Sequence, residues 1–427
     1  MLIQTSIYAG AYDGPTMFVK AYNSAKVGPA DYTCDGTDDN VEIQAAIDAL
    51  TKGGTVELSD GTFRIGDTIR IKGGLTIRGQ GQYGTEMVAK QGLNKDMLSY
   101  SESTNQYFFQ MINLTMSGGN NFTTPNTVGR GLVANNKLND GYITKCFIRY
   151  FPQNAVYLGT GWGWVLDASV IEYNAKYGGR ALEIVTGRGA RIYNCKIMEN
   201  YAENIYLWST YETSIYGCYM RAETNKNGIA LIDADRTVIV GNHFAADKAG
   251  STSVYLRYDT DDAVVNGNSF SGAAGAKTAI KIDHGGTQSV DGTTISGNSI
   301  HGYTNAIEWA QGNASVDTKV IGNSGTDVTY SSGSPTLDPA SVSQLDISLN
   351  KITATLPDGD YSGQIATIVL TTQTYPPYGV ATVTVPNYGS GIDNSCTMSS
   401  TDDMWSLMWN AAAGKWFDVI KKVSSCP

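Results

Sequence analysis

A short pattern of apolar and polar positions recurs along the middle of the chain. Each copy has an apolar residue, two spacers, a small polar residue, one spacer and usually a second apolar residue. The copies are YITKCFI (142–148), VLDASVI (165–171), RIYNCKI (191–197), SIYGCYM (214–220), VIVGNHF (238–244), VVNGNSF (264–270), TISGNSI (294–300) and KVIGNSG (319–325). A repeat of roughly 25 residues is typical of solenoids, whose successive units stack on one another.

A second apolar pattern follows each of the first seven copies. Its members are AVYL (155–158), ALEI (181–184), NIYL (204–207), GIAL (228–231), SVYL (253–256), AIKI (279–282) and AIEW (306–309). Two short alternating segments per repeat predict a right-handed parallel β-helix, in which coils stack at the strand spacing of about 4.8 Å.

The small position of the first pattern is expected to form a tight bend between two strands. Its occupants are Cys146, Ser169, Cys195, Cys218, Asn242, Asn268, Asn298 and Asn323. Asparagine tolerates the left-handed backbone that we expect at such a bend, and its amide can hydrogen-bond to the copies above and below. Cysteine would be a small, semi-buried substitute. A thiol or metal site is the alternative, and Cys195 and Cys218 on adjacent coils could also form a disulfide, although no chemistry requires one.

The segment before the repeats, residues 30–81, predicts an amphipathic helix. Asp39 can cap it with Glu42 three residues later, and Gly53 and Gly54 follow its end. Its expected apolar face is Val41, Ile43, Ala46, Ile47 and Leu50. Such a helix would cover the unpaired strand edges at the open end of the coil stack.

The same segment contains DGTDDN, then the helix, then GGTVELSDGTF and LTIRGQG, in that order. It resembles the entry to pectate-lyase-like β-helix proteins, and with the coils behind it the resemblance covers about residues 30–328. The resemblance implies the fold but not one activity, because this family includes lyases, hydrolases, epimerases, surface proteins and many viral tailspikes.

Four parts are predicted: an attachment segment (1–29), the parallel β-helix (30–330), a polar linker (331–345) and an antiparallel β-sandwich (346–427). In the last part ISLNKITATL, QIATIVLTT and VATVTV alternate as strands do, and MWSLMW and KWFDVI flank NAAAG as in a hairpin. This series resembles the small C-terminal domains of viral tail and head fibres. Cys396 and Cys426 could pair in an oxidising exterior.

The net charge of −10 argues against nucleic acid and against anionic lipid as partners, because both attract basic surfaces. No run of 18 apolar residues occurs, so no membrane insertion is expected, and the start of the chain lacks the blocks of a signal peptide. The six cysteines are too few for a disulfide scaffold, and none forms CxxC.

The outward positions of the second pattern form the candidate binding site. Side chains alternate along a strand, so the residue between two inward apolar positions points out. These residues are Tyr157, Glu183, Tyr206, Ala230, Tyr255, Lys281 and Glu308, and Trp208, Arg257 and Asp283 follow on the same strands or just after them. Aromatic rings among charged groups suit sugars, which stack on rings and hydrogen-bond to charges. A solvated or subunit-facing sheet is the alternative.

No catalytic set follows from the sequence, and no metal or cofactor is predicted. A glycoside hydrolase needs two carboxylates, one on each side of the scissile bond. Stacking would place the backbones of Asp233 and Asp283 about 10 Å apart, which is at the limit of the carboxylate separation in inverting enzymes. A uronate lyase would need cations such as Arg257 and Lys281. The acidic run at 259–263 could attract calcium, but aspartates of this kind more often cap turns.

The protein is predicted to be a virion spike or fibre protein at the surface of the particle. Its β-helix shaft is expected to bind host surface polysaccharide. A homotrimer is expected by analogy with fibres, and residues 1–29 are expected to bind other virion proteins. The alternative is a pectate-lyase-like polysaccharide lyase or glycoside hydrolase, acting as a depolymerase.

Overall fold

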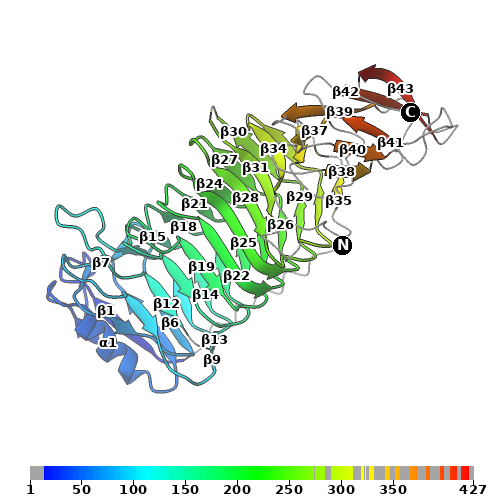
Figure 1. Cartoon of the computed structure of the whole chain (residues 1–427). Helices are drawn as coiled ribbons and strands as arrows, with labels where there is room; N and C mark the ends of the chain where they lie inside the picture. The colour runs from blue at the N-terminus through cyan, green and yellow to red at the C-terminus, as the bar shows by residue number, and fades with distance from the viewer. Residues whose placement is uncertain are drawn as a thin grey trace.

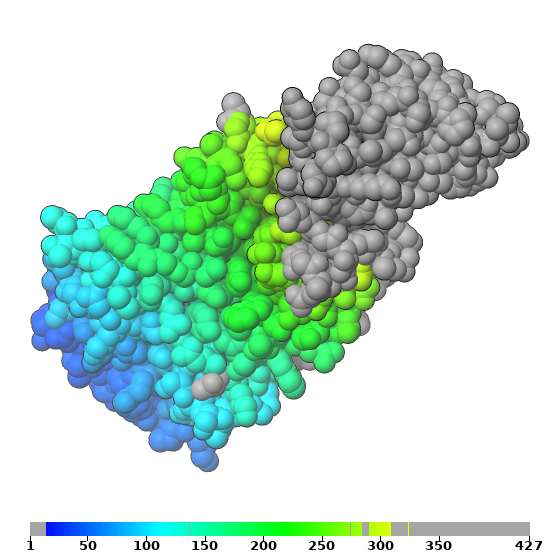
Figure 2. All heavy atoms as spheres, viewed as in Figure 1, coloured from blue at the N-terminus to red at the C-terminus, as the bar shows by residue number. Residues whose placement is uncertain are grey.

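The protein is an elongated, three-sided coil of short strands (Figures 1 and 2). The computed structural model describes residues 14–135, 137–273, 275–283 and 290–310, together with Asn323 and the strands beyond residue 310. Each regular coil contributes one strand to each of three sheets, and strands of successive coils pair in parallel. The predicted all-β parallel coil is confirmed.

Each coil passes through a first, a second and a third sheet in turn. The first sheet holds β2 (Tyr32–Thr33), β1 (Thr16–Lys20), β3 (Gly54–Leu58), β6 (Leu75–Arg78), β10 (Gln110–Ile112), β14 (Tyr142–Thr144), β17 (Val165–Asp167), β20 (Arg191–Tyr193), β23 (Ser214–Tyr216), β26 (Val238–Val240), β29 (Val264–Asn266), β32 (Thr294–Ser296) and β35 (Lys319–Ile321). The second sheet holds β4 (Gly61–Ile65), β7 (Thr85–Ala89), β11 (Thr115–Ser117), β15 (Phe147–Arg149), β18 (Val170–Glu172), β21 (Lys196–Met198), β24 (Tyr219–Arg221), β27 (His243–Ala246), β30 (Ser269–Gly272) and β33 (Ser299–His301).

The third sheet carries the candidate site. It holds β5 (Ile69–Arg70), β8 (Leu98–Tyr100), β12 (Leu132–Ala134), β16 (Val156–Leu158), β19 (Leu182–Val185), β22 (Ile205–Tyr211), β25 (Asn227–Asp235), β28 (Thr252–Arg257), β31 (Thr278–Asp283), β34 (Asn305–Ala310), β36 (Asp327–Tyr330), β37 (Val342–Asp346), β39 (Ile365–Thr372), β42 (Met404–Asn410) and β43 (Lys415–Lys422). Two short strands, β9 (Gln106–Tyr107) and β13 (Leu138–Asn139), pair separately.

Stacking in register builds the core. On the first sheet Ile192 pairs with Ile215, and Ile215 with Ile239, so equivalent side chains lie directly above one another. All three are fully buried. The apolar period of the sequence therefore becomes vertical files of aliphatic side chains inside the coil, and the outward positions become vertical files on its surface.

The bend between the first and second sheets is left-handed one residue earlier than the sequence suggested. The residues with positive φ are Lys145, Ala168, Asn194, Gly217, Gly241, Gly267 and Gly297, each directly before the small residue. The expectation that asparagine itself takes this conformation is wrong. The preceding residue turns the chain, and the turn aims the next side chain inward, where it is buried.

The buried corner residues lie in one file, and those of the later coils are hydrogen-bonded from coil to coil, as predicted. In the later coils, the backbone N–H of Asn242 donates to Oδ1 of Asn268 (2.9 Å), Asn268 to Asn298 (3.0 Å) and Asn298 to Asn323 (3.0 Å). The Nδ2 atoms of the first three donate to the same oxygens at 2.8 to 3.0 Å. Each asparagine thus satisfies polar groups of the neighbouring coils.

The cysteines occupy the same file in the earlier coils. The N–H of Cys146 donates to Oγ of Ser169 (3.1 Å), and that of Cys218 to Oδ1 of Asn242 (2.9 Å). The thiol of Cys195 donates to the carbonyl of Tyr193 (3.3 Å), and the thiol of Cys218 donates to that of Ile192 (3.7 Å). All three cysteines are free and buried, which supports the packing interpretation of these residues.

A second corner file, after the second sheet, was not found in the sequence. Phe151 N–H donates to Oδ1 of Asn174 (2.9 Å), and Asn174 N–H to Oδ1 of Asn200 (3.0 Å). Here too the preceding residues, Tyr173 before Asn174 and Glu199 before Asn200, have positive φ. The signal in the sequence would have been an asparagine three residues after a buried isoleucine, as in Ile171 and Asn174, but this spacing recurs in too few coils to stand out.

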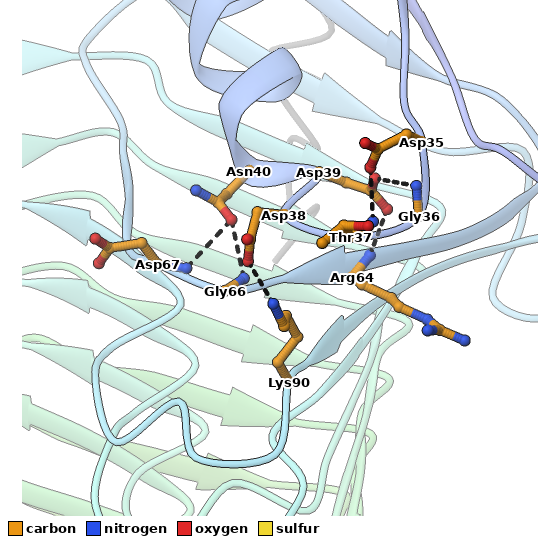
Figure 3. Close-up of polar contacts among 10 residues, drawn as sticks. All are labelled: Asp35, Gly36, Thr37, Asp38, Asp39, Asn40, Arg64, Gly66, Asp67 and Lys90. Carbon is orange, nitrogen blue, oxygen red and sulfur yellow. Dashed lines mark hydrogen bonds and ion pairs between the residues drawn. The ribbon is translucent and has the colours of Figure 1, made fainter.

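Helix α1 (Asn40–Ala49) lies at the blue, N-terminal end of the coil (Figure 1). Asp39 precedes it but makes no side-chain cap, contrary to expectation. Its carboxylate instead accepts the N–H groups of Gly36 (2.8 Å) and Arg64 (2.7 Å), as Figure 3 shows. One oxygen therefore holds the loop itself, and the other joins the loop to β4.

Other residues of the DGTDDN motif also join this loop to the first coils. Asn40 Oδ1 accepts the N–H of Gly66 (2.9 Å) and of Asp67 (3.2 Å), and Asp38 pairs with Lys90 (2.7 Å) (Figure 3). The motif therefore has a structural role, because its side chains hold the loop against the first coils. Of the predicted apolar face, Ile43, Ala46, Ile47 and Leu50 are buried, whereas Val41 is exposed and was assigned wrongly.

Segments at the two ends of the chain join the sheets. Strand β1, within the predicted attachment segment, lies between β2 and β3 in the first sheet. Beyond the coil, β39 pairs antiparallel with β42, and β42 with β43, so MWSLMW and KWFDVI do form a hairpin. Strands β38 (Ile352–Thr355), β40 (Ala381–Thr384) and β41 (Ser395–Met398) make a further small sheet. The β-sandwich itself stays a prediction, and the Cys396–Cys426 pairing lies outside the described residues.

Candidate carbohydrate-binding face

The predicted outward residues of the third sheet do form one vertical file. Register pairs Tyr157 with Glu183, Glu183 with Tyr206, and so on through Ala230, Tyr255 and Lys281 to Glu308. The three tyrosines are therefore separated by two coils each, or about 10 Å. Polar or small side chains fill the coils between them.

A second file lies two residues further along the same strands. It runs through Val185, Trp208, Ile232, Arg257 and Asp283. Together the two files bring every predicted site residue onto one surface, which we call the third-sheet face. Trp208 is 50% exposed, so part of its ring is open to solvent.

Cations that the sequence analysis missed cover the tyrosine rings in the earlier coils. The guanidinium of Arg130 lies 4.8 Å from the centre of the Tyr157 ring, and that of Arg180 lies 4.3 Å from Tyr206. Between them, Asn154 Nδ2 donates to Glu183 (2.8 Å). These three residues occupy the same repeat position, two residues before a strand of the third sheet. Aligning the repeats at that position is the signal that would have found them.

In the later coils the outward side chains are joined by hydrogen bonds and ion pairs. Tyr255 donates its phenol proton to Asp283 (2.5 Å), and Arg257 lies 3.8 Å from the same carboxylate. Lys281 pairs with Glu308 at 3.4 Å and lies 5.7 Å from the Tyr255 ring centre. The predicted residues of these later coils thus form one connected polar cluster.

These contacts change the protonation behaviour of the face. Burial and the hydrogen bond to Asp283 raise the pKa of Tyr255, and burial raises the pKa of Tyr206. Burial alone would also raise the pKa of Glu308, but a hydrogen bond from Thr278 and the charge of Lys281 lower it. The phenols are therefore neutral donors at physiological pH, and Glu308 is a carboxylate.

Ala230 is the one small residue in the outward file. It lies between Tyr206 and Tyr255 and is 1% exposed, so the larger side chains around it close over it. Tyr206 and Trp208 point outward from the same strand, β22, on the side of this small residue. An amphipathic surface of this kind offers ring faces to sugar C–H groups and charged groups to sugar hydroxyls.

The acidic residues considered for catalysis or calcium have structural partners. Asp233 accepts a hydrogen bond from Ser209 (2.7 Å). Asp235 accepts the N–H of Asp261 (3.1 Å), and Asp261 accepts that of Asp291 (3.0 Å), so carboxylates cap the backbone of the next coil. This agrees with the turn-capping interpretation of the acidic run.

Among the residues that the structure describes, one group brings together side chains of the types that bind metals. Ligand atoms of Cys34, Asp39 and Glu42 lie within 4.8 Å. Burial, followed by the charges of Asp39 and Glu42, raises the pKa of the Cys34 thiol, and Asp39 already binds two backbone N–H groups. A protonated thiol and an occupied carboxylate fit a packed joint between loop and helix better than a metal centre.

Comparison with known proteins agrees with the three-sheet architecture. Residues 130–333 match the family model described as a right handed beta helix region. The described coils therefore have the fold of a right-handed parallel β-helix. Comparison by sequence with curated proteins gives no match. Within the described part of the chain, no helix has the length and apolar character needed to cross a membrane.

Solved β-helix structures from different sources resemble this one. The Geobacillus virus E2 protein ORF18 is 14% identical, with a TM-score of 0.56, covering 96% of this chain and 77% of its own. PfbA, a surface adhesin of Streptococcus pneumoniae, is 13% identical, with a TM-score of 0.58, covering 95% and 99%. The Agl-KA catalytic domain is 14% identical, with a TM-score of 0.56, covering 78% and 66%. At these identities the likeness establishes the fold alone.

Proposed function

We propose that this β-helix protein is a virion spike or fibre component whose third-sheet face binds host surface polysaccharide. The observation that carries the proposal is the register of this face, which places Tyr157, Tyr206 and Tyr255 at every second coil, with one polar or small residue in each coil between them. A linear polymer has repeating units and needs a binding surface that repeats along one direction. The Geobacillus virus protein, similar over 96% of this chain, supports the virion setting.

The remaining parts of the proposal concern assembly. Helix α1 closes the N-terminal end of the coil and the C-terminal strands belong to a β-sandwich, while residues 1–29 attach the protein to other virion proteins. The shaft is a homotrimer. Mass photometry of the full chain tests the trimer, and a single monomer peak at micromolar concentration would remove it. Detection of the chain in purified, washed particles by mass spectrometry tests the virion location.

Replacing Tyr206 tests the binding site directly. Polysaccharides from candidate hosts are immobilised, and binding of the wild type is compared with that of Tyr206→Ala and Trp208→Ala. Both variants are expected to bind at least tenfold more weakly, because each loses a ring at the centre of the face. Tyr216→Ala is the matched control, since Tyr216 is an exposed ring on the first sheet, stacked on Tyr193. Equal losses in all three variants would contradict the assignment of the face.

A depolymerase is the second candidate, favoured by one local arrangement. Tyr255 donates a hydrogen bond to Asp283 at 2.5 Å, and Arg257 forms an ion pair with the same carboxylate at 3.8 Å, so a phenol, a carboxylate and a cation meet in one place, and general acid–base catalysis uses groups of these kinds. The wild type would release new reducing ends or unsaturated uronate absorbance from the bound polysaccharide. Tyr255→Phe and Asp283→Asn would then abolish release while retaining binding. Intact polysaccharide after prolonged incubation would leave the binding function alone.

A further inference from the structure

Four cations that contact or belong to the third-sheet face are each paired with a carboxylate, and Lys277, directly before β31, adds an exposed positive charge that helps to lower the pKa of Glu308. Arg130 lies 2.9 Å from Asp96 and Arg180 lies 3.5 Å from Glu203. Arg257 lies 3.8 Å from Asp283, and Lys281 lies 3.4 Å from Glu308. The pairs recur along the face from its early coils to its late coils.

The pairs are partly sheltered from water, and the acidic partners are the more sheltered. Side-chain exposure is 35% for Arg180 against 18% for Glu203, and 24% for Lys281 against 13% for Glu308. Withdrawing a cation toward an incoming anion would leave a sheltered carboxylate without its partner. Such separation is unfavourable, because a partly buried charge depends on its counter-charge.

The charge balance of the face also opposes an anion. Glu183 adds a fifth carboxylate to the four paired ones, and its hydrogen-bond partner, Asn154, is neutral. The whole chain carries a net charge of −10. An anionic polymer would therefore approach a surface of its own sign, with no local excess of positive charge at these residues.

From these contacts we infer that the third-sheet face takes an uncharged polysaccharide and discriminates against uronate, sulfate and sialic acid polymers. The inference rests on the proposed function and names its ligand class. Paired carboxylates still accept hydrogen bonds from sugar hydroxyls, and paired guanidinium and ammonium groups still donate to them. The half-exposed ring of Trp208 supplies an apolar surface for sugar C–H groups, which needs no charge.

The first test compares neutral and anionic polymers and varies the salt. Full-length protein is titrated with dextran, galactomannan, polygalacturonate and alginate, and with host polysaccharides sorted by charge, at 50 and 500 mM NaCl. The neutral class is expected to provide all binding ligands, with affinities that change less than twofold between the two salt concentrations. A preference for an anionic polymer that weakens tenfold in high salt would overturn the inference.

The second test releases single cations. Glu203→Gln removes the partner of Arg180, and Glu308→Gln removes that of Lys281, so both variants are expected to gain at least tenfold in affinity for polygalacturonate, with salt sensitivity. Glu86→Gln is the matched control, because it releases Arg149 from a pair of similar exposure (27% and 31%) on the second sheet. No gain in either face variant, or an equal gain in the control, would overturn the role of pairing.

The outcomes separate this inference from the function on which it depends. Binding of anionic polymers by the wild type, abolished by Tyr206→Ala, would keep the proposed site and reject its ligand class. No polysaccharide binding by the wild type, with a gain of uronate binding in Glu203→Gln, would reject the proposed function and support the charge pairing. No binding by any variant would reject both.

Discussion

The corner file between the first and second sheets has the same geometry in the earlier and later coils but different chemistry. Asn242, Asn268 and Asn298 each donate from Nδ2 to Oδ1 of the asparagine in the next coil, and also to a backbone carbonyl of the coil before. Each corner residue with these bonds is called a rung of the file. Cys218 reaches that equivalent carbonyl, of Ile192, with a sulfur at 3.7 Å. One site can thus be filled by a strong donor or by a weak one.

The backbone before the corner differs in the same direction. The asparagines follow glycine, which adopts positive φ without steric cost, whereas Cys146 follows Lys145 and Cys195 follows Asn194, both with positive φ. The earlier coils therefore combine weaker rungs with a less favourable turn. We expect the later half of the file to contribute more to stability, and the following variants test this difference.

The largest effect is expected for Asn268→Asp. This change keeps the shape but replaces the Nδ2 donor with a charge at a position that is 1% exposed. We expect a loss of about 4 kcal/mol in the free energy of unfolding at pH 7, because a buried carboxylate has no counter-charge there. Urea unfolding measures it. Stability should recover as pH falls, since burial raises the pKa of the new carboxyl and protonation removes the charge.

Asn266→Asp is the control for this variant, because Asn266 faces outward on the preceding strand and donates to Ser296 (2.7 Å). A loss of about 1 kcal/mol is expected there. Equal losses of stability at Asn268 and Asn266 would show that the corner file contributes no more to stability than an outward position does.

Removal of a whole rung compares the two halves directly. Asn268→Ala leaves the N–H of Asn242 and the carbonyl of Ile239 unsatisfied, so we expect a loss of about 3 kcal/mol. Cys195→Ala removes a weaker donor and a small volume, and about 1 kcal/mol is expected. Denaturant unfolding of both variants checks the order, and the reverse order would contradict the comparison.

Within the corner file, only the earlier coils, which carry cysteines, contain side chains that lose a proton in alkali, so only they should lose stability there. Burial raises the pKa of Cys146 to about 12, whereas a thiol in the unfolded chain titrates near 9. Its stabilising contribution is therefore complete below about pH 9 and is lost as the pH rises toward 12. We expect about 2 kcal/mol of that loss by pH 10.5. Unfolding of the wild type and Cys146→Ala at pH 8 and 10.5 measures it, and parallel pH profiles would be inconsistent with the burial of this thiol.

The smallest effect is expected for Cys218→Asn, which extends the asparagine half by one rung. The new amide would donate to the carbonyl of Ile192 and to Oδ1 of Asn242, as Asn242 does one coil later. A gain of about 1 kcal/mol is expected from replacing a thiol donor with an amide. Thermal and urea unfolding would show it. Destabilisation would mean that the corner is narrower in the earlier coils.

Much of this fold was readable because its interactions repeat. An apolar residue at the centre of each strand and a small residue at each corner recur in the aligned segments, so their roles could be averaged over eight copies. The left-handed position was missed although Gly–Asn occurs at four of the corners. The sequence alone does not say which residue of such a pair turns the chain and which faces inward.

The capping role of Asp39 failed for a different reason. Its local spacing to Glu42 fits a helix cap, but the carboxylate is taken by Arg64, which lies on a strand 25 residues away. Competition between a local and a distant donor is decided by the fold. Arg130 and Arg180 were overlooked similarly, because the rings that they cover belong to the next coil.

The amino-acid sequence by itself determined the coil: its period, its inward and outward positions, the file of small corner residues and the row of outward rings and charges. Those features follow from the alternation of side chains along strands and need no knowledge of distant contacts. Only the tertiary structure decided which residue bends at each corner and which carboxylate neutralises each cation of the third-sheet face. These depend on pairs of atoms from different coils, brought together by stacking at a spacing that sequence separation does not reveal.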